Sequence, residues 1–165
     1  MSTSSLAAVL PAELKQLKLR PLFIFQIYLV KPRMVGKTPS IDRRVAEIAG
    51  GTFEGERLRG EILSGGSDWQ ATRDDGALSI DVRFIMETDD GALIAVTYRG
   101  LRHGPREIVE RITRGEIVSP ADYYLRAAVF FETGSEKYNF LNDMVAIATG
   151  HRLPTGPIYQ VFEVL

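Results

Sequence analysis

The chain has 165 residues, of which 45% are hydrophobic and 25% are charged, a composition typical of one folded globular domain. Its 20 Lys and Arg residues against 21 Asp and Glu residues give a net charge of -1, so no basic excess favours binding to nucleic acid. The chain contains no cysteine and only 2 histidines, which excludes disulfides, cysteine-based zinc sites and a three-histidine metal centre.

The N-terminal residues do not have the features of a targeting segment. Residues 1–10, MSTSSLAAVL, lack the basic start of a secretory signal, and no apolar run approaches the roughly 20 residues that span a bilayer. We therefore expect a cytoplasmic protein with no membrane contact. Residues 1–20 are predicted to form an N-terminal arm or a short helix over 11–20, lying on a sheet or plugging a barrel end, and residues 21–165 a single domain.

The chain beyond residue 20 is dominated by patterns typical of β-strands. In residues 77–88 an apolar row from Leu78 to Met86 alternates strictly with a polar row that includes Asp81 and Arg83. Seven further strands are predicted at 21–30, 44–50, 57–63, 92–100, 123–133, 143–150 and 158–164. About eight strands with short links predict a mainly β fold, an antiparallel barrel or a strongly curved sheet.

The connections between these strands carry recognisable turn and helix signals. Asp75-Gly76 and Asp90-Gly91 are each predicted to form a type I′ hairpin turn. Residues 105–115 are predicted to form a short helix, with Pro105 at its start and Gly115 at its end, and residues 135–142 a helical turn.

Polar residues within strands are the first candidates for a site, since the common nucleotide, zinc-protease and hydrolase motifs are absent. Asp81 and Arg83 share one strand face, and Arg126 and Glu132 share a face of another. If these faces point into a closed barrel, the side chains converge on one ligand cavity. On the strand pattern alone, the alternative is favoured that Asp81 and Arg83 face water while the Leu78–Met86 row fills the core.

Two other segments concentrate groups that could carry chemistry. In SGGSDWQ (64–70), Asp68 is either a ligand-facing acid with a raised pKa beside Trp69, or a cap of a glycine turn with Trp69 closing the barrel base. In residues 130–143, Tyr138 and Asn142 together with Glu132 form either a pocket mouth or a structured turn. The two histidines, His103 and His151, are interpreted as loop residues rather than catalytic groups.

The order and spacing of four segments resemble one known family. GGTFEGERLRGEILSGGSDWQ, DGALSIDVRF, TDDGALIAVTYRG and YYLRAAVFFETGSEKYNFLN are similar to the DUF3237 family, also called UPF0311, over about residues 20–165. The resemblance implies a calycin- or lipocalin-like antiparallel barrel that often self-associates. It also implies a distant link to fungal cyclases that add a hydroxyl across an activated double bond without a cofactor. The family pattern favours a barrel lined by the positions Gly65, Gly66, Asp68, Trp69, Asp81, Arg83, Arg126, Glu132, Tyr138 and Asn142.

These observations lead to one enzyme hypothesis. The protein is predicted to bind a small oxygenated or aromatic molecule and to act as an isomerase, cyclase or lyase by proton transfer, with no cofactor and no metal. Asp68 or Glu132 would be the general acid or base, and Arg126 would hold developing negative charge together with Arg83. Trp69, Asp81, Arg83, Tyr138 and Asn142 are the predicted substrate-binding residues.

Two other classes of protein fit the same sequence. One is a non-catalytic, lipocalin-like binding protein, and the other is a structural oligomer whose barrel is filled by side chains. The apolar strand at 21–30 offers an outer face for a homo-oligomer.

Overall fold

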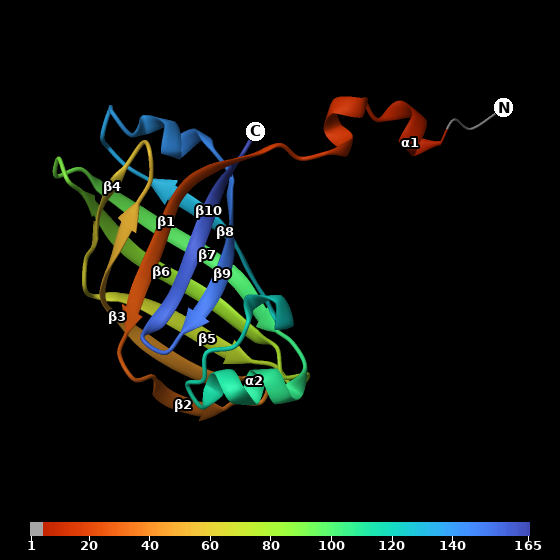
Figure 1. The fold of residues 1–165 in the computed structure, drawn as a ribbon, viewed down its shortest axis with the longest axis vertical. Coiled ribbons are helices and arrows are strands. Elements are labelled where there is room, and N and C mark those ends of the chain that lie inside the picture. Colours follow the sequence, from red (N-terminus) through yellow and green to blue (C-terminus); the bar gives the residue numbers. More distant parts are fainter. Residues whose placement is uncertain (1–4) are drawn as a thin grey trace.

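A closed antiparallel β-barrel is the central feature of the computed structural model, which describes residues 5–165 (Figure 1). Its ten strands are β1 (Leu19–Leu29), β2 (Arg33–Lys37), β3 (Asp42–Glu54), β4 (Arg59–Ile62), β5 (Gly66–Thr72), β6 (Leu78–Thr88), β7 (Leu93–His103), β8 (Tyr124–Glu132), β9 (Ala146–Leu153) and β10 (Gly156–Val164). The helices are α1 (Leu6–Val9) and α2 (Arg106–Thr113), with 3₁₀ turns η1 (Ala12–Lys15), η2 (Pro120–Asp122) and η3 (Asn139–Asp143).

The barrel closes because β1 pairs with β10 on one side and with β3 on the other. Both β4 and β5 lie between β3 and β6, at different heights, so they fill one position in the wall. The wall of the barrel therefore has eight strand positions. The additional strand β2 pairs with the first residues of β3. The predicted mainly β, antiparallel barrel of about eight strands with one or two short helices is therefore confirmed.

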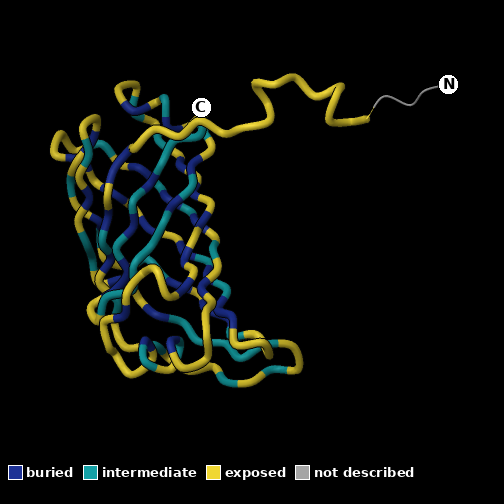
Figure 2. Tube along the Cα trace, turned by 45° about the vertical axis from the view of Figure 1, so that its right-hand side comes forward, coloured by how far each residue is buried: buried dark blue, intermediate teal, exposed yellow. Residues whose placement is uncertain are grey.

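Side chains fill the barrel interior, and a cluster of aromatic rings packs within it among aliphatic residues. Phe25 stacks on Tyr159 with ring centroids 5.1 Å apart, and Tyr98 lies 5.4 Å from Tyr159. The apolar row from Leu78 to Met86 is buried inside, as strict alternation along a half-buried strand requires. Buried and exposed positions alternate along the strands all around the barrel (Figure 2). The predicted filled core beneath the Leu78–Met86 row is confirmed.

The two Asp-Gly hairpin turns differ from the predicted type I′ geometry. A type I′ turn needs positive φ at both central residues, and among residues 5–165 only glycines have positive φ. Gly76 and Gly91 both have φ of 82°, and their N–H groups donate to the carbonyl oxygens of Arg73 and Thr88. Each turn is therefore a type I turn followed by a left-handed glycine, which is the usual geometry of a slightly longer hairpin loop.

The N-terminal segment is an arm with short helical turns, as predicted, but it does not pack on the barrel. Residues 5–18 form α1 and η1, project from one end of the barrel and bury none of their side chains (Figure 2). They neither plug the barrel nor lie on it, and strand β1 already begins at Leu19. The part of the predicted arm formed by residues 1–4 lies outside the described residues. No helix within residues 5–165 has the length and hydrophobicity needed to cross a membrane.

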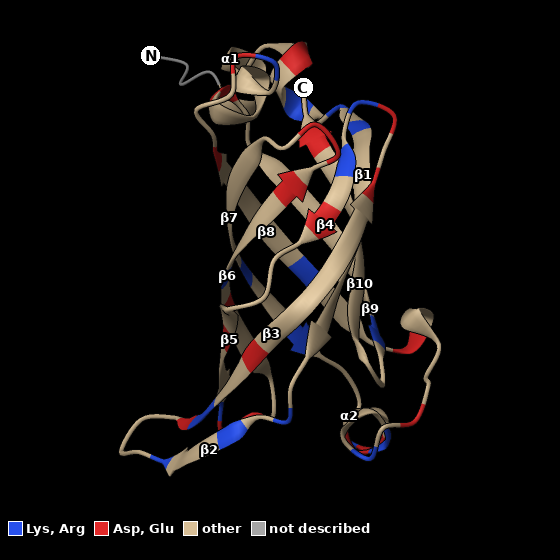
Figure 3. Ribbon diagram, turned by 90° about the vertical axis from the view of Figure 1, so that its left-hand side faces the viewer, with Lys and Arg blue, Asp and Glu red and all other residues tan. Residues whose placement is uncertain are grey.

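Charged residues of both signs occur at both ends of the barrel (Figure 3). The predicted helix over 105–115 is present as α2, and it lies at the barrel end opposite the two chain termini (Figure 1). The site described next lies inside that end of the barrel.

Candidate functional site

A group of charged and polar side chains lies inside the barrel end near α2. Asp68 on β5 and Arg102 on β7 are 3% and 7% exposed, and Gln70 on β5 is also buried. Arg44 on β3 and Arg152 on β9 join them and are partly buried. These side chains occupy the alternate strand positions that point into the barrel, as the apolar core residues do. The polar group therefore continues the inward-facing rows of the core at this end of the barrel.

Hydrogen bonds fix the orientation of Asp68. Arg44 Nε donates to Gln70 Oε1 over 2.6 Å, and Gln70 Nε2 donates to Asp68 Oδ2 over 2.5 Å. Because its oxygen is held by Arg44, the Gln70 amide must turn its nitrogen toward Asp68. The other carboxylate oxygen, Asp68 Oδ1, is buried and has no hydrogen-bond partner.

Burial changes the ionisation of this group. Burial raises the pKa of Asp68 to about 6, and the Gln70 hydrogen bond and the nearby arginines oppose that rise. Burial, together with repulsion from Arg44 and Arg152, lowers the pKa of Arg102 to about 10. Arg102 therefore keeps its charge at neutral pH, whereas Asp68 changes its charge at a pH close to neutral.

The side chains surround a cavity of about 20 Å³, which is room for about one water molecule. Its wall is polar at Asp68, Arg102, Arg152 and Tyr159, and apolar at Leu29, Leu78, Ile80, Leu125 and Pro157. Arg102 Nε and Arg152 Nη1 are buried without partners, as is the Tyr98 hydroxyl in the neighbouring core. Because buried polar atoms nearly always have partners in native proteins, these unpartnered atoms make the cavity the candidate site of this structure.

A tyrosine and a histidine hold the Arg152 backbone next to the cavity. The Tyr123 hydroxyl accepts a hydrogen bond from the Arg152 backbone N–H over 2.7 Å. The same hydroxyl forms a hydrogen bond of 2.9 Å with His151 Nδ1. His151 belongs to β9, so its interpretation as a loop residue is wrong. His103 is the last residue of β7 and stacks on Tyr124 with ring centroids 4.8 Å apart, so it too is a strand residue.

Asp81, Arg83, Arg126 and Glu132 do not converge with Asp68 on one cavity. Asp81 is on the outer face of β6 and forms an ion pair of 3.2 Å with Arg99 of β7. Arg83 is exposed on the same face. The inner face of β6 is occupied by its apolar row, and these two polar side chains must therefore point outward. The prediction that they line the barrel is wrong.

Arg126 and Glu132 also lie on the outer face, on β8. Arg126 borders an open groove of about 590 Å³ over β7, β8 and β9, and its guanidinium lies 5.2 Å from the Tyr124 ring centroid. Glu132 borders two other outer hollows, one shared with Arg83 and one with Asn142. The barrel wall separates all of them from Asp68.

Trp69 and Asp68 are neighbours in β5 and therefore point to opposite faces. Trp69 is 50% exposed on the outside, where its indole N–H donates to Ser67 Oγ, so it forms no wall beside Asp68 and does not close the barrel base. The predicted glycine turn is present at Ser64 and Gly65, where Gly65 has φ of 99°, and β5 begins directly after it at Gly66, so Asp68 lies in the strand and not in the turn. Of the two interpretations of Asp68, the structure agrees with the inward-facing acid of raised pKa.

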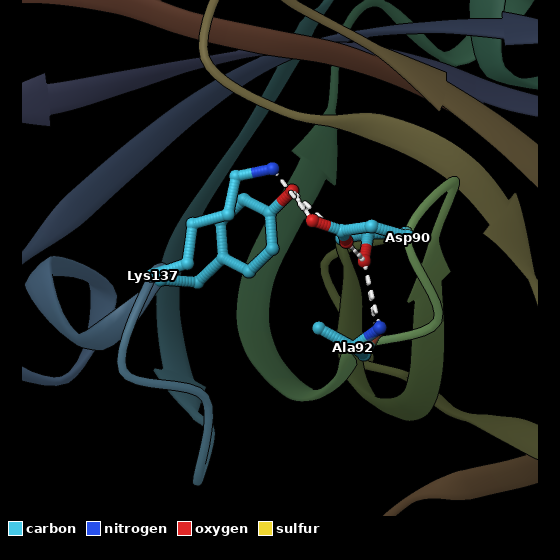
Figure 4. A network of polar contacts seen from close by, with 5 residues as sticks. Asp90, Ala92 and Lys137 are labelled. Atoms are coloured by element: carbon cyan, nitrogen blue, oxygen red, sulfur yellow. Dashed lines mark hydrogen bonds and ion pairs between the residues drawn. The ribbon is translucent and has the colours of Figure 1, made fainter.

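Tyr138 and Asn142 lie at the other end of the barrel, where they hold η3 in place. The Tyr138 hydroxyl donates to Asp90, which also accepts hydrogen bonds from Lys137 and Thr88 (Figure 4). Asn142 exchanges hydrogen bonds with the backbone of Thr133. Both residues therefore agree with the predicted structured turn, far from the Asp68 cavity.

Sequence reasoning missed Arg44, Gln70, Arg102, Arg152 and Tyr159 as members of the site. A signal was present, because Arg102 has the same strand parity as the buried Ile94, Val96 and Tyr98. A charged residue that continues a buried row is the pattern to look for. Within residues 5–165 no group of three or more acidic or histidine side chains could hold a metal ion.

Fold and site together define a closed antiparallel β-barrel with a small charged cavity in one end. The model of the family described as "Protein of unknown function (DUF3237)" matches residues 17–164, so the chain belongs to the DUF3237 family. A UPF0311 protein of Clostridium acetobutylicum is 31% identical over 152 residues, 92% of this chain and 96% of that protein.

Solved structures agree with this assignment. The crystal structure of a conserved protein of unknown function from Rhodopseudomonas palustris has a TM-score of 0.89 and 30% identity, covering 91% of this chain and 99% of that chain. A β-barrel-like protein from Acinetobacter baumannii has a TM-score of 0.80 and 39% identity, covering 91% and 97%. A more distant relative is the hydroalkoxylation enzyme phnH of Penicillium herquei, 31% identical over 62% of this chain and 53% of that protein.

Proposed function

We propose that this protein binds a small oxygenated or aromatic molecule in the Asp68 cavity and catalyses proton transfer on it without a cofactor. One observation carries the proposal: the buried Asp68 carboxyl has an unpartnered oxygen beside guanidinium groups whose own donors are unpartnered. An acid or base of this kind works best when its pKa is close to the operating pH, and burial brings the Asp68 pKa to about 6.

The arginines supply the second element of the chemistry. Removing a proton next to a carbonyl or from a hydroxyl leaves negative charge on oxygen. Arg102 and Arg152 have buried donors without partners, and fixed donors in a water-poor cavity stabilise such charge strongly. Asp68 takes the proton and returns it to another atom of the same molecule, so an isomerisation or an intramolecular addition needs no other reactant. The hydroalkoxylation enzyme of Penicillium herquei is a relative whose name describes an addition of this class.

Solvent deuterium exchange tests the proposal without knowledge of the natural substrate. Acetylacetone and phenylpyruvate are incubated with the protein in D₂O, and exchange at their acidic C–H positions is followed by NMR. We expect the wild type to accelerate exchange, and Asp68→Asn to reduce the acceleration by about 100-fold or more. Asp81→Asn is the matched control, since it removes an outer carboxylate from the adjacent strand and should leave exchange unchanged. Equal rates for Asp68→Asn and wild type would refute the role of Asp68.

A second candidate function is non-catalytic binding of a small ligand. It is favoured by the size of the cavity, about 20 Å³, in a barrel whose interior is otherwise filled by apolar side chains. Under this alternative the Asp68→Asn variant changes ligand affinity, and neither the wild type nor the variant accelerates exchange.

A further inference from the structure

We infer that the Asp68 cavity binds the carboxylate of a small organic acid between Arg102 and Arg152, and that Asp68 takes up one proton from solvent when this anion binds. The inference rests on the proposed function for the location of the ligand. It goes beyond that proposal in naming the charge class of the ligand and the proton that accompanies it.

The charge balance of the cavity favours an anion. Two arginines, Arg102 and Arg152, line the cavity together with one carboxylate, Asp68. A third arginine, Arg44, is hydrogen-bonded to Gln70, and no ion pair joins Asp68 to any of the three in the part of the chain that the structure describes. A water molecule can accept hydrogen bonds from Arg102 Nε and Arg152 Nη1, but it cannot balance their excess charge. A carboxylate does both, because its two oxygens match the geometry of guanidinium donors.

The remaining wall of the cavity indicates what the carboxylate is attached to. Leu29, Leu78, Leu125 and Pro157 form the apolar part of that wall. A cavity of about 20 Å³ encloses no more than a small head group, and these apolar side chains are the surface that any further part of the ligand contacts. A short aliphatic or aromatic acid therefore fits better than a phosphate ester or a sugar acid.

The proton follows from the position of Asp68 Oδ1. Gln70 occupies Oδ2, so Oδ1 is the oxygen free to meet an incoming carboxylate. Two ionised carboxylates in contact repel, and a shared proton replaces this repulsion by a hydrogen bond. The proton comes from solvent and forms an O–H bond at Oδ1, which then donates to the ligand oxygen.

The other groups around Asp68 do not compete for this proton. Gln70 does not ionise, and Arg102, whose pKa is lowered to about 10, stays charged at neutral pH. Burial raises the pKa of Tyr98 on β7 and of Tyr159 on β10, so both stay neutral. Asp68 is thus the group that changes charge when the anion enters.

Calorimetry with acetate and benzoate tests the inference, with acetamide and benzamide as uncharged controls of the same shape. We expect the acids to bind and the amides to bind at least about tenfold more weakly. The Kd of the acids should rise about tenfold per pH unit above pH 6, where free Asp68 is ionised. Well above pH 6, repeating the titration in buffers of different ionisation enthalpy should give an uptake approaching one proton per anion, and this uptake should fall as the pH is lowered through about 6.

Three variants complete the test. Asp68→Asn places an amide donor where the protonated acid would be, so it should bind acetate with a Kd independent of pH and with no proton uptake. Arg152→Gln should weaken acid binding at least about tenfold. Its side chain is only partly buried, so it is less prone to misfolding than Arg102→Gln. Arg126→Gln, in the outer groove, is the matched control and should bind like the wild type.

Contrary outcomes are distinct for the two proposals. Equal affinity for acid and amide, a wild-type Kd independent of pH, or no acetate binding would overturn the anion inference. Proton-coupled binding of acids without any deuterium exchange would refute catalysis and leave the anion site standing. Deuterium exchange that depends on Asp68, without any binding of acids, would refute the anion site and leave the proposed catalysis standing.

Discussion

The Gln70 side-chain amide donates to Asp68 Oδ2 over 2.5 Å and leaves Asp68 Oδ1 without a partner. The orientation of the Gln70 amide is fixed, because Arg44 donates a hydrogen bond to the Gln70 oxygen and leaves the amide nitrogen to meet Asp68. Arg44 thereby determines, through one amide, which oxygen of the buried acid faces the cavity. Arg44 and Gln70 are positioning residues for Asp68.

Replacing Gln70 should shift the ionisation of Asp68. Gln70→Met removes the donor and keeps a side chain of similar length, so the ionised form of Asp68 loses a stabilising hydrogen bond. We expect the pKa of Asp68 to rise above its wild-type value of about 6, as measured by carboxyl ¹³C NMR titration. Gln26→Met, at a partly exposed position on β1, is the control and should leave this titration unchanged.

Asp68 should make the folded protein less stable as pH rises. Its pKa is raised from 3.8 to about 6 on folding, so the folded state binds this proton more tightly than the unfolded chain. The sign of the linkage is therefore a loss of stability as pH increases from about 4 to about 6, of roughly 3 kcal/mol in total. Asp68→Asn should remove this loss, as measured by urea unfolding across that range. A wild-type dependence that persists in Asp68→Asn and disappears in Asp81→Asn would contradict the assignment.

Asp90 should control the attachment of η3 to the barrel. Hydrogen bonds from Lys137, Thr88 and Tyr138 lower the pKa of Asp90 to about 2 (Figure 4). The contribution of the ionised form is present above the ordinary aspartate pKa and is lost as pH falls toward about 2. We expect Asp90→Ala to speed hydrogen exchange in residues 134–143 while β7 and β8 stay protected. Asp89→Ala, in the same turn, should have a smaller effect, and equal acceleration in both variants would contradict the role of Asp90.

The protein should form a homo-oligomer through an apolar outer face. Ile24 and Tyr28 on β1 are 39% and 41% exposed, and Phe130 on β8 is 51% exposed. Light scattering should give a mass above that of one chain, and Ile24→Glu should reduce it to the monomer. If Phe130→Glu does so instead, the contact lies on β8. Val35→Glu, on β2, is the control, and a monomeric wild type would refute the prediction.

Much of the fold can be read from the sequence because inward and outward residues alternate. The row from Leu78 to Met86 determined both a strand and its inner face. The strands that were missed, β2 and β5, are short and begin or bend at glycine, with Gly36 in one and Gly65-Gly66 at the start of the other. Glycine interrupts the alternation that identifies a strand.

The site was harder to predict, because alternation shows which residues share a face but not which face is inside. For β6 the apolar row answers that question, and it places Asp81 and Arg83 outside. For Asp68 the neighbouring residues Gly66 and Gln70 give no such row, and the answer depends on β3 and β6 pairing on either side of β5. The charged residues that line the cavity, Asp68, Arg102 and Arg152, come from β5, β7 and β9, which are not neighbours in the sheet, so the curvature of the barrel is needed to bring them together.

The first and last strands run side by side, and the Leu165 backbone N–H donates to the Lys18 carbonyl oxygen over 2.9 Å. The barrel wall is thus a closed ring of strands, and the chain could in principle be opened at other connections between strands. A short linker from residue 165 to residue 18 would join the ends, and the chain could be reopened at the Asp90-Gly91 hairpin without cutting any strand that carries Asp68, Arg102 or Arg152 between its ends. The order in which the strands follow along the chain and the position of the Asp68 cavity are therefore independent in this architecture.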